Sequence, residues 1–360
     1  EFKSELTGPE YLSRFVEQVK QLEIPYLLNS LVINITKDKK VAIQTPDGIF
    51  IYEAKAIVFA TGCFERSAGA IKIPGDRPNG VITAGTAQKY LNIHGYLVGK
   101  KIVILGSGDI GLIMARRLTL EGAKVECVLE IMPYSNGLNR NIVQCLNDYN
   151  IPLYLSTTVS KVIGKKRVEK IIASKVDENL NFIPGTEREI ACDTLILSVG
   201  LIPYVALLKN IGVKMSMTKG PVVDEHLQTS IPGIFSCGNC LHVHDVVDFV
   251  TMEGRLAGHG AAIYLKGSAY DKHYYNVYAD KQLSYVLPQL LDPRIKEDIT
   301  IKFRVKRPVK NKNIIIKCND KIITKIYKLA LIPSEMVMVN IPKDKLDLIN
   351  DDIYVTLEDR

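Results

Sequence analysis

A glycine triplet in the middle of the chain has the spacing of a nucleotide-binding turn. Gly106, Gly108 and Gly111 follow an apolar run, and the residues after them have the pattern of a helix. In such a turn the first glycine permits a sharp bend, the second lets a pyrophosphate approach the backbone, and the third allows close packing of helix on strand. The helix N-terminus, with Asp109 and Ile110, offers N–H donors to phosphates. The triplet therefore predicts a dinucleotide site, and the alternative is an ordinary glycine turn.

An acidic residue stands where such a site needs one. Glu130 ends the next predicted strand after the glycine triplet. A carboxylate at this place accepts hydrogen bonds from a ribose 2′-OH and repels a 2′-phosphate, so it favours NAD over NADP. The alternative interpretation is a surface glutamate without a ligand.

Cysteine and histidine side chains gather in a second segment, which contains Cys237, Cys240, His242 and His244. These candidate ligands are crowded together without a second pair elsewhere, unlike the ligands of structural zinc sites, so we expect no metal here. Cys237 and Cys240 could instead form a redox pair. The segment that carries the glycine triplet has only single cysteines, which are Cys127, Cys145 and Cys192. That segment therefore offers no second candidate for a redox pair.

Two stretches of the chain share one plan. Residues 48–62 read GIFIYEAKAIVFATG, and residues 185–200 read GTEREIACDTLILSVG. Each consists of a polar hairpin arm and a buried apolar run that ends in glycine, so Gly62 and Gly200 are expected at equivalent edges of two nucleotide sites. The glycine triplet precedes only the second stretch. We expect one complete nucleotide-binding half, and one half whose opening strand, loop and helix lie upstream of Glu1.

The remaining elements follow from periodicity and from turn residues. Thr7 and Glu10 have capping-box spacing and predict a helix over 8–23. Strands are expected at 26–30, 31–35, 41–45, 49–52, 56–60, 101–105, 124–130, 153–155, 194–199 and 233–237, and helices at 110–121, 140–149 and 245–265. The strand at 56–60 is continuously apolar, as in a strand buried on both faces. Alternating runs at 299–305, 313–318 and 336–341 predict a small β-rich appendage.

Composition excludes several classes of protein. The 360 residues are 47% hydrophobic and 24% charged, which suits about two to three globular domains. The net charge is +7, but the basic residues are dispersed or lie in runs at 161–170 and 302–312, which we interpret as solvated faces and not as a nucleic-acid site. No apolar run approaches the ~20 residues that span a bilayer. Seven irregularly spaced cysteines suit a reducing cytoplasm.

Longer motifs resemble a known superfamily. Residues 229–239 read TSIPGIFSCGN, and together with 105–117, 130–135 and 237–250 they resemble the flavoprotein disulfide reductase superfamily, which has two dinucleotide domains. Within it, the chain is similar over residues 5–360 to a branch associated with anaerobic glycerol-3-phosphate-dehydrogenase-like proteins, and to the α subunits of sarcosine, opine and proline dehydrogenases. It departs from the branch at its start, where an FAD-binding G-x-G-x-x-G unit is missing, and at Asn239, where the superfamily has an acid.

The resemblance implies two cofactors, FAD and NAD. The residues that it places at FAD are Val32, Thr61, Gly62, Gly238, Asn239 and Val246, and Gly200 joins the NAD site. A helix from Asp245 would point its N-terminus at the flavin and stabilise negative charge on the reduced ring. His244 and Asp245 are the ionisable pair expected near that ring, and the alternative is that they cap the helix.

The resulting prediction is an α/β protein with two Rossmann-like three-layer domains and a β-rich C-terminal domain. The FAD-binding domain would comprise 1–95 and 221–272 and be incomplete, the NAD-binding domain 96–220, and the tail 273–360. The expected activity is hydride exchange between NAD(H) and FAD, with electrons passing to or from a small acceptor or a partner dehydrogenase subunit. The alternative is a non-catalytic NAD-binding or structural chain without flavin.

Overall fold

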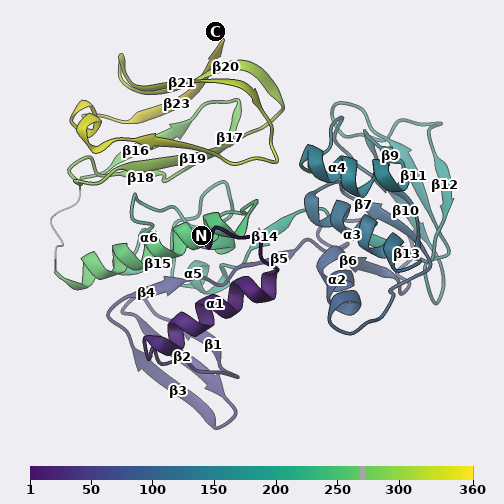
Figure 1. Ribbon diagram of the computed structural model, residues 1–360, viewed down its shortest axis with the longest axis horizontal. Helices are drawn as coiled ribbons and strands as arrows, with labels where there is room; N and C mark the ends of the chain where they lie inside the picture. Colours follow the sequence, from purple (N-terminus) through teal and green to yellow (C-terminus); the bar gives the residue numbers. More distant parts are fainter. Residues whose placement is uncertain (268–272, 360) are drawn as a thin grey trace.

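The computed structural model describes residues 1–267 and 273–359 (Figure 1). A five-stranded parallel sheet forms the centre of one part, in the order β6 (Val81–Thr83), β13 (Thr194–Leu197), β7 (Lys101–Leu105), β8 (Lys124–Leu129) and β9 (Leu153–Tyr154). Ile102 and Ile104 pack against helices α2 (Ala84–Asn92), α3 (Asp109–Leu120) and α4 (Asn139–Cys145). Val103 and Leu105 face the antiparallel sheet of β10 (Thr157–Ile163), β11 (Lys170–Lys175) and β12 (Arg188–Ala191). The predicted three-layer arrangement is therefore present here.

A second part contains elements from both ends of the first 267 residues. Helix α1 (Gly8–Gln21) starts with the predicted capping box of Thr7 and Glu10. An antiparallel sheet follows, formed by β1 (Leu31–Ile35), β2 (Lys40–Thr45) and β3 (Gly48–Glu53). Strand β4 (Ile57–Phe59) pairs in parallel with β15 (Ile234–Ser236), and α6 (Val247–Leu265) packs against both strands. As predicted, a hairpin arm followed by a parallel strand occurs twice, as β3–β4 and as β12–β13.

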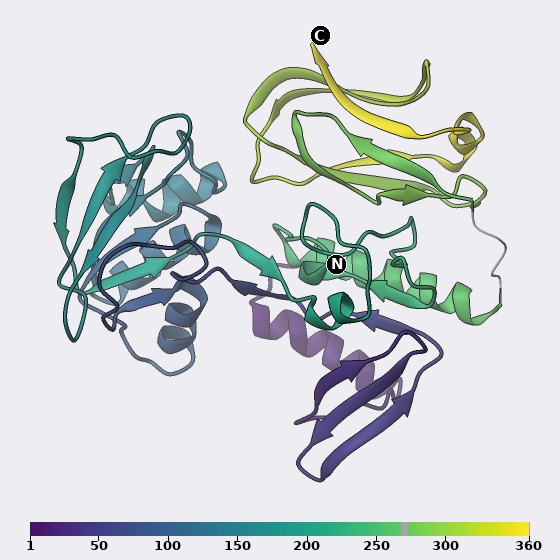
Figure 2. The ribbon, with the colours of Figure 1, turned by 180° about the vertical axis from the view of Figure 1, so that it is seen from behind.

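A short ribbon joins these two parts. Strand β5 (Cys63–Glu65) pairs with β14 (Leu201–Pro203) in antiparallel fashion. The chain thus crosses between the parts along two segments that lie side by side in both views (Figures 1 and 2). Helix α5 (Ala206–Asn210) follows the second crossing and contributes Leu208 to the core beneath β4 and β15.

The C-terminal residues form two packed sheets above α6 (Figure 2). One sheet has the order β18 (Leu290–Leu291), β16 (Tyr275–Ala279), β23 (Ile353–Asp359), β20 (Val309–Cys318) and β21 (Lys321–Leu331). The other has the order β17 (Leu283–Leu287), β19 (Ile299–Val305) and β22 (Val337–Ile341). Phe303 of one sheet and Ile314 and Val355 of the other share one buried core. The three runs predicted as strands in this region are strands.

The structure corrects several predicted elements. Residues 26–30 form no strand, because Asn29 adopts a positive φ of 51° and the segment turns instead. Strand β4 is paired on one side, and Val58 is 41% exposed, so the strand is not buried on both faces. Helix α6 begins at Val247, after Asp245. The helix predicted at 140–149 breaks at Leu146 into α4 and the 3₁₀ turn η1 (Asn147–Tyr149).

The remaining short elements are the 3₁₀ turns η2 (Gly238–Cys240) and η3 (Lys343–Leu348). Among the described residues, no helix combines the length and the apolar character needed to cross a membrane.

Candidate functional site

The glycine turn lies between β7 and α3, as predicted, and its three glycines have different surroundings. Gly106 has a φ of +100°, and a Cβ on it would lie 2.0 Å from the Ser198 carbonyl oxygen. A Cβ on Gly111 would lie 2.8 Å from the Gly106 carbonyl oxygen, so this glycine allows α3 to approach the turn. Gly108 precedes the helix, and a Cβ there would meet only the Ser198 Oγ, at 3.8 Å. The backbone at Gly108 therefore faces open space, which is what a phosphate-binding turn needs.

Glu130 is held in a fixed orientation beside this turn. Its side chain is buried, and Oε2 accepts hydrogen bonds from the Ser107 backbone N–H at 3.0 Å and the Ser107 hydroxyl at 2.6 Å. Oε1 accepts the Met132 N–H at 2.9 Å. A carboxylate has about four acceptor sites, so capacity remains for a ribose hydroxyl. Glu130 lines a pocket of about 610 Å³ together with Gly106, Gly108 and Gly200.

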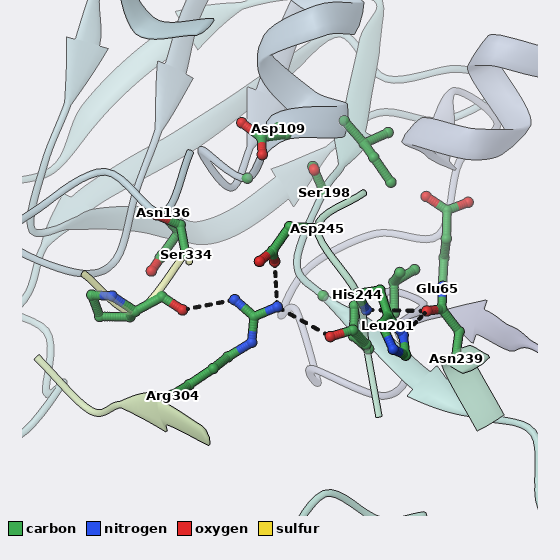
Figure 3. A pocket seen from close by; sticks show the side chains of 15 residues that line it. Glu65, Asp109, Asn136, Ser198, Leu201, Asn239, His244, Asp245, Arg304 and Ser334 are labelled. Atoms are coloured by element: carbon green, nitrogen blue, oxygen red, sulfur yellow. Dashed lines mark hydrogen bonds and ion pairs between the residues drawn. The ribbon is translucent and has the colours of Figure 1, made fainter. Parts of the chain in front are cut away.

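A second pocket, of about 540 Å³, also borders the glycine turn, and Asp109 at the start of α3 lines it (Figure 3). It shares Gly108, Asn136, Ser198 and Gly200 with the first pocket. Its far wall consists of residues from other parts of the chain, which include Asn239, His244, Asp245 and Arg304. The two pockets therefore adjoin at these four residues, and we call them together the groove. Glu130 lines one end of the groove, and the 239–245 loop and Arg304 of the C-terminal sheets line the other.

Asp109 and Ile110 both line the second pocket. Oδ1 of Asp109 accepts hydrogen bonds from the Leu138 N–H at 2.9 Å and the Asn141 side-chain amide at 2.7 Å. This carboxylate therefore fixes the loop that covers the glycine turn. Its contribution to a nucleotide would come through the backbone at the start of α3.

His244 and Asp245, the candidate catalytic pair, are engaged with different partners. Asp245 forms an ion pair with Arg304 and accepts the Met336 N–H at 2.8 Å. Nδ1 of His244 lies 3.1 Å from the Asn239 Oδ1. The alternative that they cap helix α6 is wrong, because the N-cap is Val246 and no side chain caps this end. Asp245 thus attaches the C-terminal sheets to the wall of the groove.

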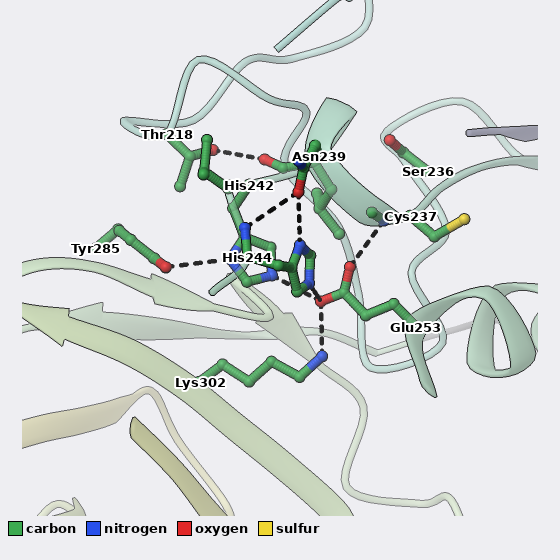
Figure 4. A network of polar contacts seen from close by, with 12 residues as sticks. Thr218, Ser236, Cys237, Asn239, His242, His244, Glu253, Tyr285 and Lys302 are labelled. Carbon is green, nitrogen blue, oxygen red and sulfur yellow. Dashed lines mark hydrogen bonds and ion pairs between the residues drawn. The ribbon is translucent and has the colours of Figure 1, made fainter. Parts of the chain in front are cut away.

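A buried polar network lies behind His244 and was not predicted from the sequence (Figure 4). At its centre Glu253, which is fully buried, has Oε1 2.6 Å from the Lys302 Nζ, 2.6 Å from the His242 Nε2 and 3.2 Å from the His244 Nε2. Oε2 accepts the Gly238 N–H at 2.9 Å. A glutamate between Met252 and Gly254 in the predicted helix was the available sequence signal, but its partner in β19 was not evident.

Burial and hydrogen bonding act in opposite directions on this network. Burial alone would raise the pKa of Glu253, but hydrogen bonds from His242 and His244 and the charge of Lys302 outweigh it and hold the pKa well below its usual value. Burial lowers the pKa of His242, against the opposing effect of Glu253. The ligand atoms of His242, His244 and Glu253 are close enough for a metal ion. The Lys302 ammonium, however, already supplies a cation to Glu253.

The cysteines of this segment are buried, whereas the cysteines of reactive dithiols are partly exposed. All seven cysteines are free. Burial raises the pKa of Cys237 to about 12, whereas reactive thiols have a lowered pKa. Cys240 is fully buried, and its Sγ lies 3.3 Å from the Phe59 carbonyl oxygen and 3.1 Å from the Cys237 carbonyl oxygen.

The residues expected at FAD form two groups, and one residue lies apart from both. Gly238, Asn239 and Val246 lie together at the carboxyl end of β15 and the start of α6, and Asn239 reaches the groove. Thr61 and Gly62 follow β4, where the Thr61 hydroxyl donates to the Tyr204 carbonyl oxygen at 2.7 Å. Val32 lies apart from these residues, in β1 of the antiparallel sheet (Figure 1).

These residues suit the ring and ribityl chain of FAD better than its pyrophosphate. Strand β4 continues through Gly62 into β5 and not into a helix. Among the described residues, the β4–β15 part therefore contains no strand–glycine turn–helix unit like that at 101–120. Donors for a ring or a ribityl chain are present at the groove, but a comparable cradle for the pyrophosphate of FAD is not among the described residues.

The five-stranded parallel sheet, its glycine turn and the adjoining groove are the features of a dinucleotide-binding fold. The chain matches the pyridine nucleotide-disulphide oxidoreductase family over residues 2–266 and belongs to that family. Members of this family are typically flavin-dependent NAD(P)H oxidoreductases.

Named relatives support this assignment. The chain is 28% identical over 268 residues to an NADH oxidase of Methanocaldococcus jannaschii, and the matched region covers 71% of this chain and 55% of the relative. It thus spans about half the length of that relative. It is 27% identical over 252 residues to a ferredoxin–NADP reductase of Streptococcus pneumoniae, covering 68% and 71% of the two chains. The crystal structure of T. acidophilum thioredoxin reductase matches with a TM-score of 0.57 and 25% identity, covering 73% of this chain and 81% of that one.

Proposed function

We propose that this chain binds NAD(H) at the Gly106–Gly111 turn and takes part in hydride exchange between the nicotinamide and FAD. The observation that carries the proposal is that the two pockets of the groove adjoin at the glycine turn. A dinucleotide with its adenosine ribose at Glu130 and its pyrophosphate at Gly108 would extend past Ser198 and Gly200 into the second pocket. That pocket is bounded by Asn239 and the loop before α6, where the resemblance places the flavin.

In this proposal the bound cofactor and the residues of the chain have different roles. Bound FAD would supply the two-electron chemistry. The chain's own contribution is to orient the nucleotide along the glycine turn and to exclude water from the second pocket. The Asp245–Arg304 ion pair supports this role, because it attaches the C-terminal sheets to the groove wall. His244 and Asp245 are proposed as positioning residues, since each already has protein partners at the groove.

Glu130 supports a preference for NAD over NADP. A 2′-phosphate would lie beside a buried carboxylate, which opposes its binding. The named relatives include an NADH oxidase and a ferredoxin–NADP reductase, so the family alone does not decide the nucleotide. We propose NADH on the basis of this carboxylate.

The electron acceptor is proposed from the motif resemblance. The segments 105–117 and 237–250 support membership in the branch associated with glycerol-3-phosphate-dehydrogenase-like proteins and dehydrogenase α subunits. We therefore propose that electrons pass to or from a partner subunit or a small acceptor. The seven free cysteines support a location in a reducing cytoplasm.

The proposal can be tested by placing a large side chain at Gly108, which lines both pockets. Gly108 has a φ of −66°, which any residue adopts, and its side-chain direction is open. Gly108→Leu should therefore fold normally while weakening NADH binding at least ~100-fold, because the side chain occupies the position of the pyrophosphate. The control is Gly258→Leu, at another open glycine, on α6. Calorimetric titration with NADH measures both; unchanged affinity in Gly108→Leu would refute the proposed binding position.

The structure also favours one alternative, a chain that binds NAD without flavin. It rests on the β4–β15 part, whose described residues offer no pyrophosphate turn. The two functions differ in colour, because a flavoprotein purifies yellow and absorbs near ~450 nm. A colourless protein that binds NADH and transfers no electrons to a dye, even with added FAD, would support the alternative.

A further inference from the structure

We infer that His226, His259 and Glu297 form a binding site for a zinc-like divalent cation, away from the groove. Their ligand atoms all lie within 4.8 Å of one another. Nε2 of His259 is 3.0 Å from the Glu297 Oε1, and Nε2 of His226 is 3.6 Å from the Glu297 Oε2. Two imidazoles and one carboxylate are a donor set that zinc accepts, with a fourth position left for water.

Backbone packing brings the two histidines together. The N–H of His226 donates to the Asp224 Oδ1 at 3.0 Å, which fixes the turn that presents this histidine. A Cβ on Gly260 would lie 2.6 Å from the His226 carbonyl oxygen, so α6 touches this turn at a residue without a side chain. The neighbouring residue on α6 is His259, and its ring centroid lies 5.9 Å from that of His226. The proximity of the rings thus follows from a close helix–turn contact.

The surroundings of the cluster match a metal site in a second respect. Nδ1 of His226, the ring nitrogen that does not face Glu297, lies 3.5 Å from the Glu225 Oε1. A carboxylate on the far nitrogen of a ligating histidine fixes its orientation and raises its basicity. Imidazole donors favour zinc, nickel or copper over magnesium or calcium.

A second cluster of this kind among the described residues is a weaker candidate. His242, His244 and Glu253 have suitable spacing, but the Lys302 ammonium is 2.6 Å from the Glu253 Oε1 and holds the place of a cation. At Glu297 the two histidines themselves are the ion partners. His259 and Glu297 are about half exposed, at 51% and 48%, so a cation can reach them from solvent.

The site would join three segments that are distant in the sequence. His226 lies before β15, His259 lies on α6, and Glu297 lies just before β19 of the C-terminal sheets. One ion would therefore fasten α6 to the C-terminal sheets on the side away from the Asp245–Arg304 contact. Binding to the folded state alone must stabilise that state, so zinc should raise the melting temperature.

The test is zinc titration of the full chain after removal of metals with EDTA. We expect binding of one Zn²⁺ with a rise in melting temperature, and d–d bands of tetrahedral Co²⁺ when cobalt replaces zinc. His259→Ala and Glu297→Gln should each weaken zinc binding more than ~100-fold, since even outer-shell partners contribute about 10–100-fold. Both residues are exposed enough for these variants to fold.

His94→Ala is the control, because His94 is an exposed histidine beyond α2. It should leave zinc binding and the cobalt spectrum unchanged. The inference is overturned if the parent protein binds no zinc, or if zinc affinity in His259→Ala equals that in His94→Ala. Retained binding in both cluster variants, with loss in a His244→Asn variant, would assign the metal to the Glu253 network and would overturn it as well.

Discussion

Removal of the Lys302 ammonium should destabilise the protein far more than removal of a surface lysine. Lys302 is 5% exposed and Glu253 is fully buried, with 2.6 Å between their charged atoms. Breaking a buried pair by removing one partner costs about 3–5 kcal/mol, because the other charge stays buried. Glu253 keeps His242 at 2.6 Å and the Gly238 N–H at 2.9 Å. We therefore expect the low end of this range, about 3 kcal/mol, for Lys302→Met.

Protonation of His242 can replace part of the lost charge, so the effect should depend on pH. Without Lys302, the Glu253 carboxylate raises the proton affinity of His242, and acidification from pH 8 to pH 6 should reduce the destabilisation. The double variant Lys302→Met/Glu253→Gln removes both charges and should be more stable than the sum of the single changes predicts. Urea unfolding followed by circular dichroism measures all three variants, since the chain has no tryptophan.

A matched control lies in the neighbouring sheet. Lys312 Nζ is 2.7 Å from the Asp359 Oδ1, but the Asp359 side chain is 89% exposed. Lys312→Met should cost well below ~1 kcal/mol, as exposed pairs do. A loss below ~1 kcal/mol for Lys302→Met, or additivity in the double variant, would show that the network does not hold α6 against the C-terminal sheets.

Three further predictions concern pH, nucleotide and thiol. The stability that Glu253 contributes is complete above its unfolded pKa near 4.5 and is lost as the pH falls toward its lower folded pKa. The urea concentration at the unfolding midpoint should therefore decrease over this pH range, and it should decrease less in Glu253→Gln. Glu130→Ala should narrow the difference between NADH and NADPH affinities, and tighter NADPH binding by the parent protein would contradict the role of Glu130. Cys240→Ser should leave NADH-to-dye electron transfer largely intact, whereas a loss above ~100-fold, about 2.7 kcal/mol, would show a catalytic thiol.

A fourth prediction concerns the flavin. A polypeptide of residues 1–360 should retain less than one equivalent of FAD, because its described residues offer no pyrophosphate turn beside β4. The ratio of absorbance near ~450 nm to protein concentration measures this. Stoichiometric, tightly held FAD would show that the β4–β15 part builds its site in another way.

Local patterns predicted those elements whose cause is local. The capping box at Thr7 predicted α1, and the glycine triplet predicted the turn between β7 and α3. Strand 56–60 was expected to be buried on both faces because its residues are apolar, but burial depends on which strands pair with it. Val58 is 41% exposed, so one face of β4 is partly uncovered, and β4 pairs with β15 on one side only.

Contacts within a local motif of the site could be predicted from the sequence, but contacts between distant segments could not. The glycine turn follows β7, and Glu130 follows the adjacent parallel strand β8. The carboxyl ends of adjacent parallel strands lie at the same edge of the sheet, so the sequence motif could predict that Glu130 lies beside the turn. The contacts of Glu253 with Lys302 and of Asp245 with Arg304 join α6 and its approach to β19. No local pattern specifies how a β-rich tail packs against a helix, so these pairs required the structure.

The β5–β14 ribbon gives two of the predicted cofactor residues a mechanical role. Gly62 precedes β5 and Gly200 precedes β14, and both have a positive φ, of 71° and 98°. The two crossings are hydrogen-bonded to each other, so the parts cannot slide apart without breaking this ladder. A change in the angle between them must instead be taken up by backbone torsion at the ends of the ribbon. These glycines therefore stand at the pivots about which the two walls of the groove would turn.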